Sequence, residues 1–247
     1  MSYNRDEKKA TRQLFDACER GDTKAVEALV DHQDVKINWH CPQSYGATAL
    51  IAATANGHID VVQILLEKGA ALGELKTPDR NSPLHEAAIR DQPEIMSMIL
   101  RRIQEMSNQA VPSSLIDLQN QFGNTPLHNA ARTGSVECVA YLLEAGARAD
   151  LKNVNGSLAL HHACYCDKSN LRIVKRLVEA GSDVNHQDNQ GFTPLMVAAK
   201  KNQTDIIDYL RSHGADVQAR NQFGEDAMHF AMLRDNRDAM QLLDVAE

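Results

Sequence analysis

The amino-acid sequence predicts an all-α fold built from a repeated helix–turn–helix unit. The stretch Gly-Asn-Thr-Pro-Leu-His-Asn-Ala-Ala at residues 123–131 recurs in similar form before and after that position in the 247-residue chain. Each copy is followed by a stretch whose apolar residues are spaced like one buried helix face. The composition agrees, because 43% hydrophobic residues with only 4% aromatic residues suit a stack of helices rich in Ala, Leu and Val.

The recurring residues align as seven units, which start near residues 10, 46, 80, 123, 156, 191 and 224. The first and last units are expected to act as end caps, because the two ends of a repeat array face solvent. Residues 1–9 are polar and charged, and we expect a flexible lead-in there. Residues 10–247 are expected to form a single domain.

The third and fifth units are longer than the others. In the third unit the insertion lies at about 101–114, where we expect the second helix to continue into a loop that Pro112 closes. This insertion is either a tolerated loop or a second contact site. In the fifth unit the extra residues lie at 165–169, between its two helices.

Each recurring residue has a physical role. A Thr, Ser or Asp at the start of a first helix can accept a hydrogen bond from an otherwise unpaired backbone N–H, and these residues are Thr48, Ser82, Thr125, Thr193 and Asp226. A proline at the next position needs no N–H, and the leucine after it is expected to be buried. A glycine supplies the left-handed conformation that ends a second helix, at Gly69, Gly146, Gly181 and Gly214.

The motif Thr-Pro-Leu-His-x-Ala-Ala, followed by a Leu-Leu-x-x-Gly-Ala ending, resembles the ankyrin repeat, whose period is about 33 residues. The resemblance covers residues 10–247 and implies an all-α ankyrin-repeat solenoid of helix-turn-helix units with β-turn or hairpin connections. It also implies a non-enzymatic adaptor or scaffold whose partner protein docks on a concave face made of turn tips and first helices. The alternative is a regulatory or targeting subunit of a larger enzyme complex, including a kinase or transcription-factor inhibitor, or a secreted bacterial effector.

The same resemblance implies a set of partner-binding residues. At the turn tips they are Tyr45, Arg80, Asn81, Phe122, Asn124, Val154, Asn155, Phe192, Phe223 and Glu225. On the first helices they are Glu86, Arg90, Asn129, Arg132, His162, Tyr165, Lys200, Lys201, Phe230 and Arg234. Aromatic and Arg side chains dominate binding hot spots, which favours Tyr165 and Arg132, whereas Phe122 and Phe223 either bind a partner or pack against the neighbouring turn.

The stretch from His161 to Asp167 contains residue types that bind zinc. The repeat register points His161 and Cys164 in different directions on one helix, so we predict no metal and no cofactor. We also predict no enzyme, because neither a phosphate-binding Gly-x-x-x-x-Gly-Lys-Ser/Thr loop nor a Gly-x-Ser-x-Gly elbow occurs. A metal- or thiol-dependent enzyme that uses His162, Cys164 and Cys166 is a further alternative.

Four histidines share one repeat position and are expected to tie neighbouring turns by hydrogen bonds: His85, His128, His161 and His229. The segment that ends at Asn185 is similar to strings that asparaginyl hydroxylase modifies in some ankyrin proteins, which makes Asn185 a candidate modification site.

The net charge of −7 argues against nucleic acid as a partner. The five cysteines are odd in number and irregularly spaced, which favours free thiols in a reducing compartment, cytoplasmic or nuclear. No apolar stretch reaches 18 residues, so we expect no transmembrane segment. A monomer is favoured.

Overall fold

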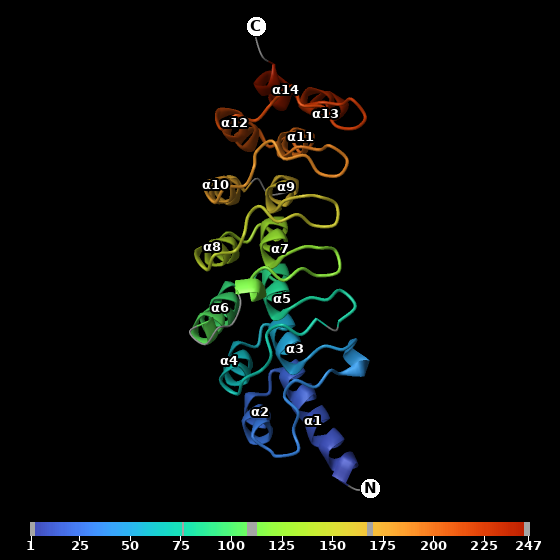
Figure 1. Ribbon diagram of the computed structural model, residues 1–247, viewed down its shortest axis with the longest axis vertical. Helices are drawn as coiled ribbons and strands as arrows, with labels where there is room; N and C mark the ends of the chain where they lie inside the picture. Colours follow the sequence, from blue (N-terminus) through green and yellow to red (C-terminus); the bar gives the residue numbers. More distant parts are fainter. Residues whose placement is uncertain (1–2, 76, 108–112, 167–169, 245–247) are drawn as a thin grey trace. The chain divides into compact units, whose positions relative to one another are not determined.

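The computed structural model describes residues 3–75, 77–107, 113–166 and 170–244 (Figure 1). Within these residues the chain forms fourteen α-helices and two short 3-10 helices and no strand, which confirms the all-α prediction. A single isolated β-bridge joins Cys41 and Ala47. The internal contacts gather into two compact units, residues 1–122 and residues 123–247, and the division falls at a predicted repeat boundary. From here on, these two are called the first unit and the second unit, and each contains several of the seven repeats.

The first unit contains two rows of helices. The first-helix row consists of α1 (Tyr3–Arg20), α3 (Ala49–Ala55) and α5 (Pro83–Ile89). The second-helix row consists of α2 (Thr23–Val30), α4 (Ile59–Glu67) and α6 (Pro93–Ser107). The 3-10 helices η1 and η2 lie in the connections, at Pro42–Ser44 and Ser113–Leu115.

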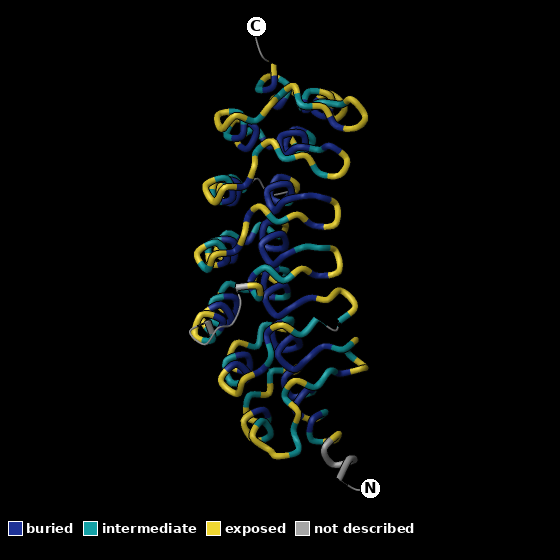
Figure 2. The backbone as a smooth tube through the Cα atoms, in the orientation of Figure 1, coloured by how far each residue is buried: buried dark blue, intermediate teal, exposed yellow. Residues whose placement is uncertain are grey.

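The second unit repeats the arrangement. Its first-helix row consists of α7 (Pro126–Thr133), α9 (Ala159–Tyr165), α11 (Pro194–Lys200) and α13 (Ala227–Leu233). Its second-helix row consists of α8 (Val136–Glu144), α10 (Leu171–Glu179), α12 (Thr204–Ser212) and α14 (Arg237–Leu243). In each unit the first-helix row is largely buried, and exposed residues concentrate on the second-helix row and on the turn tips (Figure 2).

The first helices begin as the sequence predicts. Thr125 accepts a hydrogen bond from the N–H of His128, and the Nδ1 atom of His128 accepts one from the N–H of Thr125 at 3.2 Å. The histidine therefore takes the place that Glu or Gln usually occupies in a capping box. Four further first helices have the predicted side-chain cap, at Thr48, Ser82, Thr193 and Asp226. The leucine that follows the cap and the proline is buried in α7, since Leu127 is 1% exposed.

Four second helices end at a left-handed glycine, as predicted. The φ angles are +78° at Gly69, +91° at Gly146, +87° at Gly181 and +84° at Gly214. No heavy atom lies within 4 Å of the position that a Cβ would take at these glycines. The requirement for glycine therefore comes from the backbone conformation alone.

Two boundaries differ from the sequence analysis or extend it. Helix α1 begins at Tyr3, inside the stretch expected to be a flexible lead-in, because Glu7, Lys8, Lys9 and Ala10 are good helix formers. Helix α6 continues to Ser107, as the insertion predicts. The loop that Pro112 is expected to close at 108–112 lies outside the described residues. Of the predicted extra residues at 165–169, Tyr165 ends α9 and Cys166 caps it, and 167–169 lie outside the described residues. Across the described helices, none has the length and apolar content needed to cross a membrane.

Candidate functional site

The turn tips of the second unit are shaped by Asn and Asp side chains. The N–H of Asn153 donates to the carbonyl of Ser157 at 3.0 Å, and the Oδ1 atom of Asn153 accepts from the N–H groups of Asn155 and Ser157. Asp188 and Asn221 make the same pattern in the next two turns. The backbone of each tip is therefore held by the Asn or Asp side chain of its own turn.

Successive tips are joined by backbone hydrogen bonds. The N–H of Asn189 donates to the carbonyl of Asn155 at 2.9 Å, and the N–H of Gln222 donates to the carbonyl of Gln190 at 3.0 Å. These bonds fix the spacing between one tip and the next.

The repeat histidines link each first helix to the following turn. The Nε2 atom of His128 lies 3.1 Å from the carbonyl of Ser157, and that of His161 lies 3.0 Å from the carbonyl of Phe192. Since a carbonyl only accepts, Nε2 carries the proton and Nδ1 is free to accept from the helix start. The predicted tie is confirmed at these two positions. At His229 the prediction is wrong, because its ring is exposed and its Nε2 atom lies 3.3 Å from Glu225 instead.

Burial keeps these histidines neutral. Desolvation lowers the pKa of His128 to about 4, although its bond to Ser157 opposes the shift. Desolvation likewise lowers the pKa of His161. A general base at neutral pH needs a pKa near the working pH, so these imidazoles are suited to hydrogen bonding and unsuited to proton transfer.

A hollow of about 370 Å³ lies between the turn tips and the first-helix row of the second unit. We call it the second-unit groove, and it is lined by Arg132, Ser157, His161, His162, Tyr165, Asp188, Gln190, Phe192, Val197 and Lys200. The Tyr165 ring is 57% exposed. The Nζ atom of Lys201 lies 4.3 Å from the centre of that ring, in a cation–π contact that orders both side chains.

His162 gives the wall of the second-unit groove a neutral polar group. Its Nε2 atom lies 3.2 Å from the Nδ2 atom of Asn153, and its ring meets the His128 ring edge-on at 5.3 Å. Desolvation, with further contributions from His128, His161 and Arg132, lowers the pKa of His162 to about 3. The half-buried ring therefore adds no positive charge to the groove at neutral pH.

The first unit has a groove of similar volume with a different charge. This first-unit groove is lined by Glu19, Ser44, Tyr45, Ala47, Ile51, Ala52, Ala55, Asn56, Thr77, Pro78, Asp79, Asn81 and Glu86. Among the described residues of its lining there are three carboxylates and no Lys or Arg. The two grooves are formed by the same parts of the repeat, but the second-unit groove has Arg132 and Lys200 beside its one carboxylate, Asp188.

The structure distributes the predicted binding residues over several environments. Those that line a groove are Tyr45, Asn81 and Glu86 in the first unit and Arg132, His162, Tyr165, Phe192 and Lys200 in the second. Those exposed at other tips and helix ends are Arg80, Arg90, Phe122, Val154, Asn155, Phe223 and Arg234. Half-buried positions outside the grooves are Asn124, Lys201 and Glu225.

Three of these residues are buried, and the exposure expected for them is wrong. Asn129 is 1% exposed inside α7, and Phe230 is 5% exposed because its ring packs 5.1 Å from the ring of Phe192. Asn81 is buried because its side chain bonds Glu86 and Asn120, which holds the turn together.

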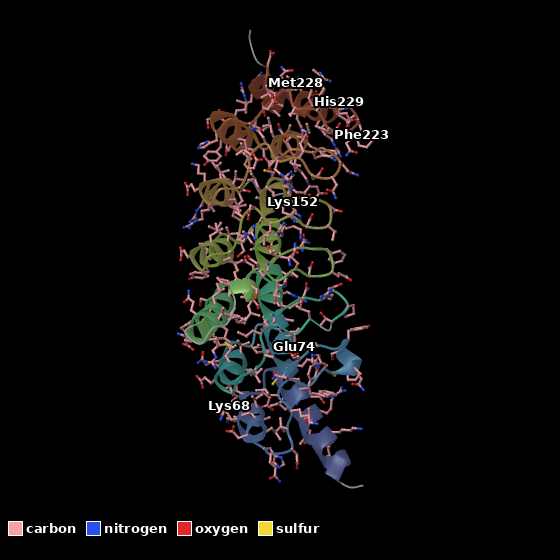
Figure 3. The ribbon with its side chains drawn as sticks, viewed as in Figure 1. Lys68, Glu74, Lys152, Phe223, Met228 and His229 are labelled. Atoms are coloured by element: carbon pink, nitrogen blue, oxygen red, sulfur yellow. The ribbon has the colours of Figure 1, made fainter. Side chains whose placement is uncertain are left out.

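Phe122 and Phe223 are not fully packed against the neighbouring turn, which was one of the two alternatives for these residues. Phe122 is 50% exposed and Phe223 is 69% exposed. Figure 3 shows Phe223 on the turn that precedes α13, and His229 on that helix. Most of the Phe223 ring is therefore available to a partner.

Several groove residues were not predicted to bind. They are Ser157, His161, Asp188, Gln190 and Val197. His161 and Asp188 form hydrogen bonds that stabilise the fold, and each also lines the groove. In the sequence, the recurrence of Asn153, Asp188 and Asn221 at one position of successive turns is the signal that could have identified the turn residues of the groove.

The five cysteines are buried, and none of them forms a disulfide within the described part of the chain. Burial raises the pKa of Cys18 to about 12 and raises that of Cys164 further above its ordinary value. A thiol with a raised pKa and no exposure is a poor nucleophile. Among the side chains that the structure describes, no group of three or more His, Cys, Asp or Glu residues is placed to hold a metal ion.

Asn185, the candidate modification site, links two adjacent turns. Its Nδ2 atom donates to the carbonyl of Gly214 at 2.8 Å, and its Oδ1 atom accepts from the N–H of Asp216 at 2.8 Å. Both polar atoms of the amide are thus engaged. Hydroxylation at this residue stays a prediction.

Comparison with known proteins gives consistent matches to one repeat family. The profile described as ankyrin repeats (3 copies) matches residues 14–111, 103–188 and 166–244. The chain is 26% identical over 250 residues to the human transient receptor potential cation channel subfamily A member 1, which covers 85% of the chain and 21% of the channel. It is 32% identical over 178 residues to the chicken nuclear factor NF-kappa-B p105 subunit, which covers 70% of the chain and 17% of that protein.

Among solved structures, the chain is similar to the ankyrin repeat domain of Bcl-3, described as a unique member of the IkappaB protein family. The TM-score is 0.75 at 25% sequence identity, and the match covers 94% of this chain and 97% of the other. The chain spans only about a fifth of the human channel and of the chicken subunit. Their activities as whole proteins therefore belong to longer chains.

Proposed function

The chain belongs to the ankyrin-repeat family, and from this premise we propose that it is a non-enzymatic adaptor that binds a partner protein through its turn tips and first-helix rows. The ankyrin repeat is typically a protein-interaction module. The observation that carries the proposal is the second-unit groove, where an exposed aromatic ring and several cations surround a hollow that the fold itself does not fill.

The arrangement of Tyr165 and Lys201 suits binding. A free surface tyrosine loses side-chain freedom when a partner covers it, which weakens association. Here the ring is already held by Lys201 at 4.3 Å, so less freedom remains to be lost. Tyrosine also combines a large apolar face with a hydroxyl group, and it is enriched among residues that dominate interface energetics.

The chemistry of the described residues supports a binding role over catalysis. The groove imidazoles have lowered pKa values and are held by structural hydrogen bonds. The thiol of Cys164 is buried and its pKa is raised. Neither group is placed or tuned to activate a substrate at neutral pH.

The second candidate function is a regulatory subunit that inhibits or targets a larger complex. The observation that favours it is the likeness to the ankyrin repeat domain of Bcl-3, a member of the IkappaB protein family, and to the nuclear factor NF-kappa-B p105 subunit. We propose a cytoplasmic or nuclear location and a monomeric state on the grounds given by the sequence. A kinase inhibitor and a bacterial effector are consistent with the same surface.

Site-specific photo-crosslinking tests the proposal. A benzophenone amino acid is placed at Tyr165 in one variant and at Tyr141 in another, and each is irradiated in lysate before mass spectrometry. Tyr141 is the matched control, because it is a tyrosine in the same unit, 39% exposed, but on the second-helix row. We expect a discrete crosslinked protein at Tyr165 only. Equal crosslinking at the two positions, or crosslinking at Tyr141 and none at Tyr165, contradicts the proposed face.

A further inference from the structure

The two rows of helices in the second unit differ in their charged residues. All charged side chains on the first-helix row and its C-terminal caps are basic, namely Arg132, Lys200, Lys201 and Arg234. The second-helix row of the same unit mixes acidic residues with basic ones, as in Glu137 and Asp205 beside Arg172 and Arg211. The basic sign of these four residues is opposite to the net charge of the whole chain, which is −7.

The fold does not demand this charge. In the first unit, the charged residues that the structure describes in the lining of the corresponding groove are Glu19, Asp79 and Glu86, all acidic. Glu86 is paired with Arg90 at 4.0 Å, but Arg90 does not line that groove. The basic character of the second unit is therefore a property of its own residues at positions that the repeat leaves free.

The second-unit groove places apolar surface beside these cations. Tyr165, Phe192 and Val197 supply the apolar lining, and Arg132 and Lys200 line the same hollow. Asp188 is the acidic member of the lining. One of its carboxylate oxygens accepts the N–H groups of Gln190 and Phe192 at 2.9 Å, so this charge is engaged by its own turn.

On these grounds, and resting on the proposed function, we propose that the second-unit groove binds an acidic segment of a partner protein, with a bulky apolar side chain in the hollow and flanking Asp or Glu residues facing Arg132, Lys200 and Lys201. The volume of about 370 Å³ is near the lower end of the ~300–1,000 Å³ typical of ligand cavities, which suits one anchoring side chain. Complementary charge raises the association rate and rejects basic partners.

A nucleic acid is the less favoured source of negative charge. Binding to single strands uses a row of aromatic rings on which successive bases stack. In the lining of the second-unit groove the aromatic rings are those of Tyr165 and Phe192 together with two neutral imidazoles, and Phe192 already packs against Phe230. A protein segment with a single anchor matches this geometry better.

The test uses the full chain and a displayed library of random 12-residue peptides. Selected peptides are synthesised with a fluorophore, and their affinities are measured by anisotropy. We expect selected sequences to be enriched in Asp and Glu around one aromatic or large aliphatic residue. We also expect the dissociation constant to rise as NaCl increases.

Two matched variants locate the binding. The groove variant carries Arg132→Gln, Lys200→Gln and Lys201→Gln, and it should weaken peptide binding by about tenfold or more. The control variant carries the same change of net charge on α10 of the second-helix row, through Arg172→Gln, Lys175→Gln and Arg176→Gln, and it should change affinity by less than about twofold.

A charge-preserving variant separates loss of charge from loss of fold. With Arg132→Lys, Lys200→Arg and Lys201→Arg, binding should remain within about threefold of wild type. Selected peptides without acidic enrichment, equal losses in the groove and control variants, or failure to select any peptide would each overturn the inference. So would a single-stranded oligonucleotide that binds more tightly than the peptides and is released by the groove variant. Specific crosslinking at Tyr165 would still support the adaptor function in every one of these cases.

Discussion

Acidification should weaken the second unit through its buried histidines. The pKa of His128 is about 4 in the folded protein, against an ordinary value of 6.5 in the unfolded chain. Between these values the unfolded state binds a proton that the folded state excludes. Stability is therefore highest above pH 6.5 and falls as the pH is lowered toward 4.

The magnitude follows from the same two values. Each pH unit between them is worth about 1.36 kcal/mol, so the free energy of unfolding should fall by about 2.5 kcal/mol between pH 7 and pH 4.5 on account of His128 alone. The lowered pKa values of His161 and His162 act in the same direction. His162 is partly exposed, so its contribution is smaller than the shift itself indicates.

Urea denaturation followed by circular dichroism at pH 7 and pH 4.5 measures this effect. His128→Gln removes the titrating group, and His213→Gln is the control because His213 is exposed in the same unit. At pH 7 His128→Gln should be the less stable variant, since the bond to Ser157 is lost. Its deficit relative to wild type should shrink by about 2.5 kcal/mol at pH 4.5. A deficit that is the same at both pH values would refute the reasoning, whatever the carboxylates contribute.

Three further outcomes are expected. Leu127→Ala should lower the free energy of unfolding by about 2–5 kcal/mol, since the side chain is 1% exposed, and an unchanged urea midpoint would contradict its place in the core. Gly191→Ala should lower the melting temperature more than Gly181→Ala. Both glycines have positive φ, but an added Cβ would lie 2.8 Å from the Cα of Asn221 at Gly191 and would contact no atom within 4 Å at Gly181. Equal melting temperatures of the two variants would contradict this reasoning. The thiol of Cys164 should resist iodoacetamide at pH 8 until denaturant is added, and rapid alkylation of the folded protein would show that the thiol is accessible.

The sequence predicts most of the fold because the repeat motif is made of local interactions. The cap at Thr125, the proline after it and the glycine at the end of the second helix act over three or four residues, so each can be recognised without knowing its neighbours. The continuation of α6 is predictable for the same reason. Helix α1 shows the limit, because it begins at Tyr3, within a charged stretch for which the sequence predicts a flexible lead-in.

The candidate site is less predictable because it depends on what neighbouring turns cover. Register places Asn129 and Arg132 on the same short helix, yet only Arg132 reaches solvent. Phe230 was expected to be exposed and is covered by Phe192 from the preceding turn. The different charged linings of the two grooves also arise only when residues from separate turns and helices are brought together, as Glu19 and Asp79 are in the first unit.

Histidines that bond at both ring nitrogens should affect the order in which the repeats of the second unit open. At His128 and His161 one imidazole joins the beginning of its own helix to the turn of the next repeat, so neither can loosen without the other. At the equivalent position of α11 stands Met196, whose thioether makes no comparable link. Amide hydrogen exchange should therefore proceed in a sequence, with α13 and α14 losing protection as a pair while the histidine-linked repeats before them stay closed.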